Sequence, residues 1–474
     1  MSRFHPPHHL QAGHIPWLSE AKASLSLSGH LLLSQVSLML MPVMDILTTA
    51  ALGASTVAAV GLLNSFVALL LLFCFGVMQA MAPLAGNALN APGGSLAARQ
   101  ILAQALRLAT ALGLIAIVAA HLFVLLLPHL GQEAAVVMPA RHYVHALAPA
   151  LLPAAWLTAW RVGYPLLGQA RELSTTLMAC ALLHGLTNRL LVGGLGEWPG
   201  MGISGLGWSY VLTYGLAALR FFSRDRQAAH SKQLPAQPGA VRPMQPWMRR
   251  LLGIGLPIGA VMAIEYMLFT GSTLLMGRHG GQALAAHAIA LQWVTLAFIV
   301  PLAMSNTVLT RLSLALGKAD QDEVRRVVSV ACAIALGFHL LIALVYLAAP
   351  GPLAGWLLPA SSRDRELLVA MATPMVQLAA LLQAFNGMAV VLAAVLRACR
   401  DTRAPMAQVF AGYWLVGLGS AWLLSTVLGP IGVWLGMCLG FGLTIVLLVR
   451  RVRRRLLQLS DIFPQPEVAH AQSR

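Results

Sequence analysis

Two acidic side chains inside long apolar stretches are the residues of this chain that could do chemistry. Asp45 lies in SQVSLMLMPVMDILTTAALG, which starts at Ser34, and Glu265 lies in GLPIGAVMAIEYMLFTGSTLLMG, which starts at Gly255. A charge at bilayer depth costs roughly 2.5–3.5 kcal/mol on insertion scales, so it persists mainly where it faces a cavity or a partner. Each acid is either a carboxylate that binds and releases a cation or a proton inside a transporter, or a protonated carboxyl that only ties two helices together.

The composition places these acids in an integral membrane protein. Hydrophobic residues make up 58% of the 474-residue chain and charged residues 10%, with a mean hydropathy of +0.76. A soluble domain carries about 25% charged residues. The formal net charge is +16, but the basic residues lie at the ends of apolar runs, so they indicate orientation in a membrane and no nucleic acid partner. The five cysteines have no CxxC or metal-ligand spacing, and no metal site is expected.

The apolar runs predict about twelve membrane-spanning helices, because each run is near the length that a bilayer requires. The predicted spans are 30–53, 61–86, 101–128, 142–167, 174–195, 203–223, 250–277, 284–312, 326–349, 366–396, 405–428 and 431–449. Most Lys and Arg residues between the spans fall in alternate loops on one side, together with the tail motif RRVRRR at 450–455. The positive-inside rule then places both termini in the cytoplasm.

A basic segment rich in Pro and Gln, from Arg224 to Arg250, divides the chain into two similar halves. GASTVAAVGLLNS, from Gly53, aligns with GGQALAAHAIALQ, from Gly280. Two six-helix halves would share one orientation and be related by an axis along the membrane normal, with a site between them near the midplane.

Several of these segments resemble one known family. GLPIGAVMAIEYMLF, then GGQALAAHAIALQ, then PLAMSNTVLTRLSLALGKAD is similar to the seventh and eighth helices of the MATE (multidrug and toxic compound extrusion) family, especially its NorM-like branch. MDILTTAALG, from Met44, resembles the first-helix pattern of that family, and LRACRDTRAPM, from Leu396, matches the loop after its tenth helix. The resemblance covers roughly residues 29 to 450.

The resemblance implies an all-α fold with twelve helices in two six-helix lobes around a V-shaped cavity. It implies export of small cationic or amphipathic compounds in exchange for Na+ or H+, with no cofactor beyond the coupling ion, in the bacterial inner membrane. We expect a monomer that is not an enzyme. The expected parts are a cytoplasmic tail (1–28), an N-lobe (29–223), a cytoplasmic linker (224–249), a C-lobe (250–449) and a basic cytoplasmic tail (450–474).

Individual residues match functional positions of the family. Asp45 matches the first-helix aspartate, associated with protonation and drug binding, and Glu265 matches the seventh-helix glutamate, associated with cation binding. Asn188, in HGLTNRLLVGG, matches a fifth-helix asparagine near that aspartate. His184 stands one helical turn before Asn188, where the family commonly has an asparagine, and the two share a helix face. His184 is either a neutral core histidine or part of a proton site.

One departure concerns the coupling ion. NorM-like proteins tend to carry an aspartate eleven residues before the arginine of the Leu-Arg pair, and counting back from Arg397 gives Asn386. A neutral amide can coordinate a cation but cannot balance its charge, so this substitution favours H+ over Na+.

Polar and aromatic residues in the apolar runs are further candidates. Tyr266 and Phe269 flank Glu265, and rings of this kind hold organic cations through cation–π contacts. Gln79 and Gln292 are candidates for the substrate cavity, although interhelical hydrogen bonding is the simpler interpretation. Trp156 and Trp160 lie one turn apart, and for all four aromatic residues a bilayer-facing or packing position is the simpler interpretation.

Three other functional classes fit the sequence less well than an exporter does. A lipid-linked oligosaccharide flippase of the same superfamily tends to have more basic residues in its cavity, whereas the deep charges here are mainly acidic. A membrane-embedded enzyme would need a motif such as HExxH or GxSxG within the spans, and neither occurs. A channel fits two acids on pseudo-symmetric halves less well than alternating access does.

Overall fold

The computed structural model describes residues 17–90, 94–231, 245–359 and 364–462, and this part of the chain is almost wholly helical. The first half contains α1 (Trp17–Thr49), α2 (Ala54–Met78), α3 (Met81–Leu89), α4 (Gly94–Leu126), α5 (Ala134–Leu166), α6 (Ala170–Gly193) and α7 (Ile203–Ser231). The second half contains α8 (Gln245–Gly277), α9 (Gly281–Lys318), α10 (Gln321–Ala348), α11 (Pro350–Trp356), α12 (Arg365–Ala398), α13 (Arg403–Phe410), α14 (Gly419–Leu428) and α15 (Pro430–Ile462).

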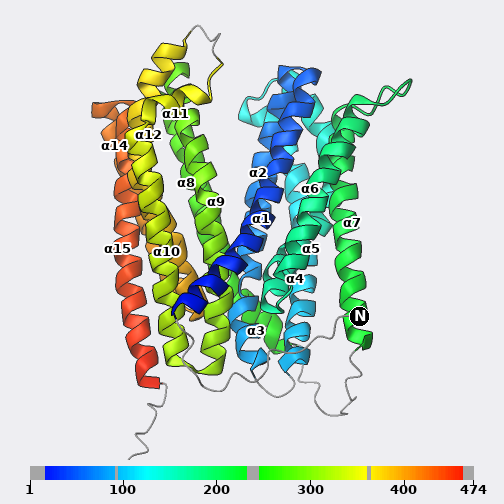
Figure 1. Cartoon of the computed structure of the whole chain (residues 1–474). Helices are drawn as coiled ribbons and strands as arrows, with labels where there is room; N and C mark the ends of the chain where they lie inside the picture. Colours follow the sequence, from blue (N-terminus) through cyan, green and yellow to red (C-terminus); the bar gives the residue numbers. More distant parts are fainter. Residues whose placement is uncertain (1–16, 91–93, 232–244, 360–363, 463–474) are drawn as a thin grey trace, which may run out of the picture.

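Within the described residues, ten helical segments are long and apolar enough to cross a membrane. Two of them contain more than one α-helix: α2 runs on into α3, and a π-helical segment, Ala411–Leu418, joins α13 to α14. The long helices α5 and α7 run beside these ten (Figure 1). Prolines, aromatic rings and charged residues in α5 and α7 lower their hydropathy. Together they make the twelve long helical segments that the sequence predicts.

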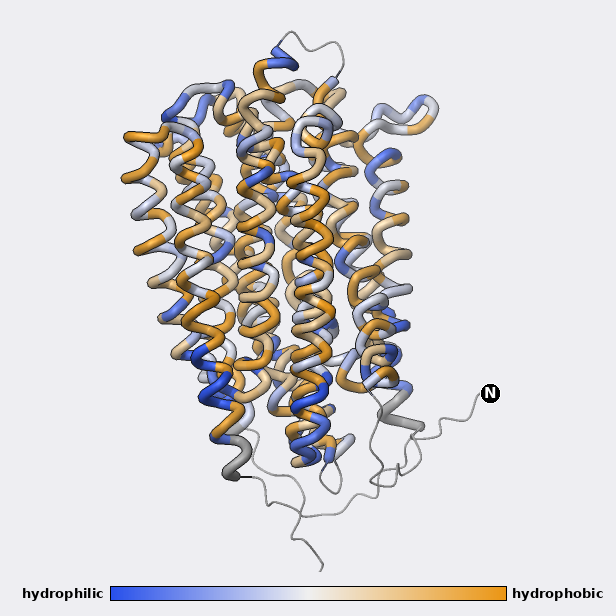
Figure 2. Tube along the Cα trace, turned by 60° about the vertical axis from the view of Figure 1, so that its left-hand side comes forward, coloured by the Kyte–Doolittle hydropathy of each residue, from blue (hydrophilic) through white to orange (hydrophobic). Residues whose placement is uncertain are grey.

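The helices form two bundles (Figure 1). One bundle, the N-lobe, contains α1 to α7, and the other, the C-lobe, contains α8 to α15. Apolar residues dominate the middle of the bundles, and hydrophilic residues gather towards the two ends (Figure 2). This distribution is what a bilayer requires, because lipid-facing backbone must be helical and lipid-facing side chains apolar.

The lobes are held together most closely at the end where α3 meets α9, which we call the closed end. A Cβ atom on Gly86 would lie 2.3 Å from the carbonyl oxygen of Ser313, and one on Gly317 would lie 2.3 Å from the carbonyl oxygen of Gly86. Asn90 Nδ2 also donates to the carbonyl oxygen of Leu314 at 3.3 Å. Glycine is therefore required on both helices, because any side chain there would force them apart.

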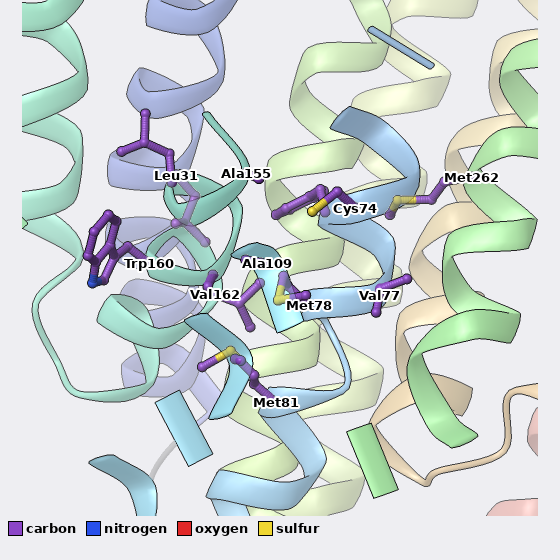
Figure 3. Close-up of a cluster of buried hydrophobic side chains, with 14 of the residues drawn as sticks. Leu31, Cys74, Val77, Met78, Met81, Ala109, Ala155, Trp160, Val162 and Met262 are labelled. Carbon is purple, nitrogen blue, oxygen red and sulfur yellow. The ribbon is translucent and has the colours of Figure 1, made fainter. Parts of the chain in front are cut away.

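A second line of contact joins α2 to α8. A Cβ atom on Gly76 would lie 2.7 Å from Gly259 Cα, so these two backbones also touch. Met262 of α8 packs beside Cys74 and Val77 of α2 in a hydrophobic cluster that belongs mainly to the N-lobe (Figure 3). The apolar core is thus continuous across the lobes at this depth.

The start of α1 differs from the prediction, which begins the first span near residue 30 and treats 1–28 as a tail. The helix begins at Trp17, and its first turns reach the C-lobe. Glu20 is almost fully buried and accepts from Arg311 Nε at 2.7 Å and Nη2 at 2.5 Å, while Ser28 donates to Thr307 at 2.9 Å. These partners on α9 satisfy polar groups that would otherwise keep this stretch out of a helix bundle.

The linker and the basic tail are also more helical than the predicted boundaries suggest. Residues 224–231 continue α7, α8 begins at Gln245, and α15 extends to Ile462. Arg451 and Arg455 of α15 each donate to Asp401 Oδ2 at 2.7 Å. Although burial raises the pKa of Asp401, these two hydrogen bonds outweigh it and hold the pKa below its ordinary value. The end of α15 is therefore fixed to the loop between α12 and α13.

Candidate functional site

Asp45, on α1, is fully buried and accepts hydrogen bonds on both carboxyl oxygens. Oδ1 accepts from His184 Nε2 at 2.8 Å and from Asn188 Nδ2 at 3.0 Å, both on α6. Oδ2 accepts from Tyr210 on α7 at 2.6 Å and from Asn64 Nδ2 on α2 at 3.1 Å. The structure therefore brings together the three residues that the sequence predicts for the N-lobe, Asp45, His184 and Asn188.

A second layer orients these donors. Tyr143 of α5 donates to Asn64 Oδ1 at 2.8 Å, which leaves the Asn64 amide nitrogen to face Asp45. Ser209 Oγ lies 3.2 Å from His184 Nδ1, and Thr187 contacts Ser209 in turn. Ser209 Oγ also donates to the carbonyl oxygen of His184 at 3.3 Å, so Ser209 contacts both the ring and the backbone of this residue. Five helices thus contribute to one carboxylate.

Four hydrogen-bonding groups face the two oxygens of Asp45. A proton on either oxygen would add a hydrogen where two groups already face it, so at least one of them would have to move. Because these groups lie on α2, α6 and α7, that movement would change a contact between α1 and a neighbouring helix.

Sequence reasoning missed Asn64, Tyr143, Tyr210 and Ser209. Each is a hydroxyl or amide inside an apolar run, and such residues commonly form hydrogen bonds between membrane helices. That signal was present in the sequence, but nothing in it identified which partner each would meet, because the partners lie on four different helices.

Glu265 lies in a different environment, in the wall of a cavity of about 550 Å³ between the lobes. The wall is formed by α2 of the N-lobe and by α8, α9 and α12 of the C-lobe. The lining residues are Leu62, Ser65, Leu72, Met262, Glu265, Tyr266, Phe269, Thr270, Thr273, Leu274, Leu291, Val294, Thr295, Phe298, Leu302, Asn386, Val390 and Arg397. The lining is mainly apolar and aromatic with few polar groups, which is typical of sites for small organic ligands.

The polar groups of this cavity are poorly satisfied within the described residues. Glu265 Oε1 is buried without a hydrogen-bond partner, and so are both polar atoms of the Asn386 side chain, which is 1% exposed. Buried polar groups are normally paired, so groups that lack a protein partner indicate where a ligand, ion or water binds. This contrasts with Asp45, whose acceptor positions the protein fills.

The structure shows which of the predicted polar and aromatic candidates line this cavity. Tyr266 and Phe269 line the cavity, and the Tyr266 hydroxyl donates to the carbonyl oxygen of Ser65 across the lobes at 3.1 Å. Gln79 does not line it; this residue is fully buried and accepts from Arg397 Nη1 at 2.8 Å. Gln292 is exposed and lies outside the lining.

The tryptophan pair packs inside the N-lobe, in agreement with its interpretation as packing aromatics. Trp156 donates to Thr110 at 2.8 Å, and the fully buried Trp160 donates to Asp225 at 2.9 Å. Neither residue belongs to the cavity lining.

Comparisons with known proteins agree on one family. The MatE family model matches residues 31–188 and 257–423. The chain is 31% identical to a probable multidrug resistance protein NorM of Pseudomonas putida, over 92% of this chain and 94% of that protein. A NorM protein of Agrobacterium fabrum is 29% identical over 92% of this chain and 94% of its own length.

Solved structures show the same fold. The bent form of the Vibrio cholerae MATE transporter VcmN superposes with a TM-score of 0.82 at 19% identity, covering 94% of this chain and 99% of that one. The eukaryotic MATE transporter AtDTX14 superposes with a TM-score of 0.77 at 18% identity, covering 94% of this chain and 100% of that one. These likenesses concern the two-lobe architecture.

Proposed function

Because this chain belongs to the MATE family of transporters, we propose that it exports small cationic or amphipathic organic compounds in exchange for protons. The observation that carries the proposal is the pair of carboxylates within long apolar helices, which lie in different settings. Asp45 is saturated by donors inside the N-lobe, whereas Glu265 faces the cavity between the lobes with an unpaired oxygen. A proton and an organic cation would both lower the cost of the buried charge on Glu265, so they can compete for it.

The cavity supports an aromatic or amphipathic cation as substrate. Tyr266, Phe269 and Phe298 present rings to it, and rings attract organic cations when water is excluded. Hydroxyls of Thr270 and Thr273 add few directional contacts, which suits a transporter that accepts several compounds. Both carboxylates and the whole cavity lie within one chain, so the proposal needs no partner subunit.

Protons are favoured over Na+ because the cavity has one carboxylate. Among the residues that line it, Glu265 is acidic, Asn386 is neutral and Arg397 is basic. A hard cation such as Na+ prefers several oxygen ligands, and the charge of those ligands tunes its affinity. A proton needs only the carboxylate itself.

The coupling ion is tested with purified protein in vesicles. With an imposed pH gradient and no Na+, we expect uptake of a fluorescent cation such as ethidium against its own gradient, in the direction opposite to proton flow. An imposed Na+ gradient with equal pH on both sides should drive no uptake. Transport under the Na+ gradient alone would show that the missing carboxylate does not matter and would overturn proton coupling.

A lipid-linked oligosaccharide flippase is the second candidate, and Arg397 in the cavity is the observation that favours it, because a guanidinium suits an anionic phosphate. Glu265 in the same wall offsets that charge, and the volume of about 550 Å³ fits a drug-sized molecule rather than a long glycolipid. The ethidium assay separates the two, since a flippase would not concentrate a soluble cation.

We further propose that the closed end faces the cytoplasm of a bacterial inner membrane, because the basic loops and the basic end of α15 lie at that end. Single cysteines in a cysteine-free chain test this. A membrane-impermeant maleimide added to whole cells should label Glu197→Cys, in the loop before α7, and leave Gln227→Cys, near the end of α7, unlabelled. The reverse pattern would invert the topology.

A further inference from the structure

Arg397 of α12 links the cavity to the contact between the lobes. It lines the cavity, is 5% exposed, and donates through Nη1 to Gln79 Oε1 at 2.8 Å. Gln79 lies between α2 and α3 of the N-lobe, and its Nε2 donates to Asn306 Oδ1 of α9 at 3.4 Å. One N-lobe amide is therefore held by two C-lobe side chains. We call Gln79, Asn306 and Arg397 the cavity floor.

The guanidinium is buried and donates to the neutral Gln79, so its charge must be balanced from elsewhere. Glu265 is the carboxylate that lines the same cavity and interacts electrostatically with Arg397, although no direct ion pair joins them among the described residues. With Glu265 ionised, the two formal charges of the cavity lining sum to zero. With Glu265 neutralised by a proton or an organic cation, the floor holds an unbalanced positive charge.

Other titratable groups lie near this pair, and one is His339 of α10, which is buried against Gly387 of α12, beside Asn386. Tyr413, in the π-helical segment, interacts with both residues, and Tyr266 follows Glu265 on α8. On α9, His287 contacts Thr273 of the cavity wall at 3.3 Å. The α2 residues of the lining are Leu62, Ser65 and Leu72, and α15 packs Phe441 against Phe269; none of these titrates. Glu265 and Arg397 therefore dominate the charge balance of the cavity.

We propose that Arg397 is the positioning residue through which a proton or an organic cation bound at Glu265, here called the load, opens the closed end. The inference rests on the exchange proposed above. When Glu265 is ionised and free, its charge balances Arg397 and the floor stays shut. When a proton or a cation occupies Glu265, Arg397 becomes an uncompensated buried charge, which is strongly unfavourable. Separating the lobes at the floor exposes Arg397 to water and relieves that penalty.

This mechanism links the occupancy of Glu265 to one conformational change. A carrier with a proton or a substrate on Glu265 favours opening of the closed end, whereas an empty carrier with ionised Glu265 favours the closed state. A population shift of this kind requires that the load stabilise one state more than the other, and the charge of Arg397 supplies that difference.

The test measures opening of the closed end directly. Ser313 of α9 is fully buried there and its hydroxyl has no partner, so Ser313→Cys in a cysteine-free chain keeps the packing and reports separation from Gly86. In vesicles with equal pH inside and outside and no substrate, labelling of this cysteine by N-ethylmaleimide should speed up as the pH falls. Arg397→Gln should abolish that acid-dependent rise.

Three matched variants separate charge from packing. Arg397→Lys keeps the charge and should restore the acid-dependent rise. Gln79→Leu removes the hydrogen bond but no charge, so labelling should be faster at every pH while still rising in acid. In Glu265→Gln the side chain at position 265 is neutral at every pH, so the cysteine of Ser313→Cys should be labelled fast at every pH. This measurement does not depend on the stability of the Arg397 variants.

Two outcomes would overturn the proposal: an undiminished acid-dependent rise in Arg397→Gln, or slow, wild-type labelling at alkaline pH in Glu265→Gln. The readout is also independent of the exported compound. If the wild-type chain fails to transport ethidium yet shows the acid-dependent rise and its loss in Arg397→Gln, the proposed substrate class fails and the role of Arg397 stands.

Discussion

Replacing Asp45 with asparagine is expected to reduce proton-driven efflux to the background of empty vesicles. Four donors point at the two oxygens of Asp45, and an asparagine amide would turn an NH₂ group towards two of them. Each buried donor left unpaired costs about 1–3 kcal/mol. The substitution also removes the charge that a proton would cancel. Efflux of ethidium from reconstituted vesicles at equal protein amounts measures the loss.

Loss of folding must be separated from loss of function in this variant. Trp156→Phe is a matched control, since Trp156 packs inside the N-lobe and donates to Thr110, outside the hydrogen-bond network of Asp45. We expect Trp156→Phe to retain most efflux with a small decrease in thermal stability. If Asp45→Asn instead transports at the wild-type rate while remaining folded, the network around Asp45 only ties helices together.

Replacing Glu265 with glutamine is expected to abolish coupled efflux while the protein stays folded. Glu265 Oε1 has no hydrogen-bond partner to lose, and a neutral amide is cheaper to bury than a carboxylate, which offsets part of the penalty for leaving Arg397 unbalanced. A glutamine cannot release a proton, so substrate and proton no longer compete. Efflux under a pH gradient, together with a thermal melt of the same preparation, checks both parts of the expectation.

Asn386→Asp is the paired control for Glu265→Gln. The aspartate would face the same cavity and add a second carboxylate to its wall. We expect this variant to remain active and to acquire dependence on Na+, because the added charge favours a metal cation. Wild-type efflux in Glu265→Gln would falsify a coupling role for Glu265, whatever the behaviour of Asn386→Asp.

Much of this architecture could be predicted from the sequence because it is dictated by the bilayer. The runs of apolar residues predicted the helices, and the two isolated acids marked the two sites. The family resemblance placed Asn188 near Asp45, the shared helix face added His184, and the structure shows both side chains beside Asp45. Apart from the resemblance, such inferences use only neighbours along one helix or the cost of burying a charge.

The remaining features depend on contacts between helices far apart in the chain. Tyr210 and Asn64 reach Asp45 only because α7 and α2 pack against α1, and no local pattern specifies that pairing. Gln79 appeared to be a cavity residue from its polarity, whereas its partner Arg397 lies 318 residues away. The early start of α1 was missed for the same reason, because Glu20 looks like a tail residue until Arg311 is placed beside it.

That last contact also bears on how the chain is assembled in the cell. Glu20 leaves the ribosome before Arg311, which is synthesised 291 residues later. At about 5–20 residues per second, roughly 15–60 s separate the two. During that interval the first turns of α1 lack their C-lobe partner, and the N-lobe must be held in the membrane by its own helices. The contact between Glu20 and Arg311, which joins the lobes, therefore forms late, after α9 has been inserted.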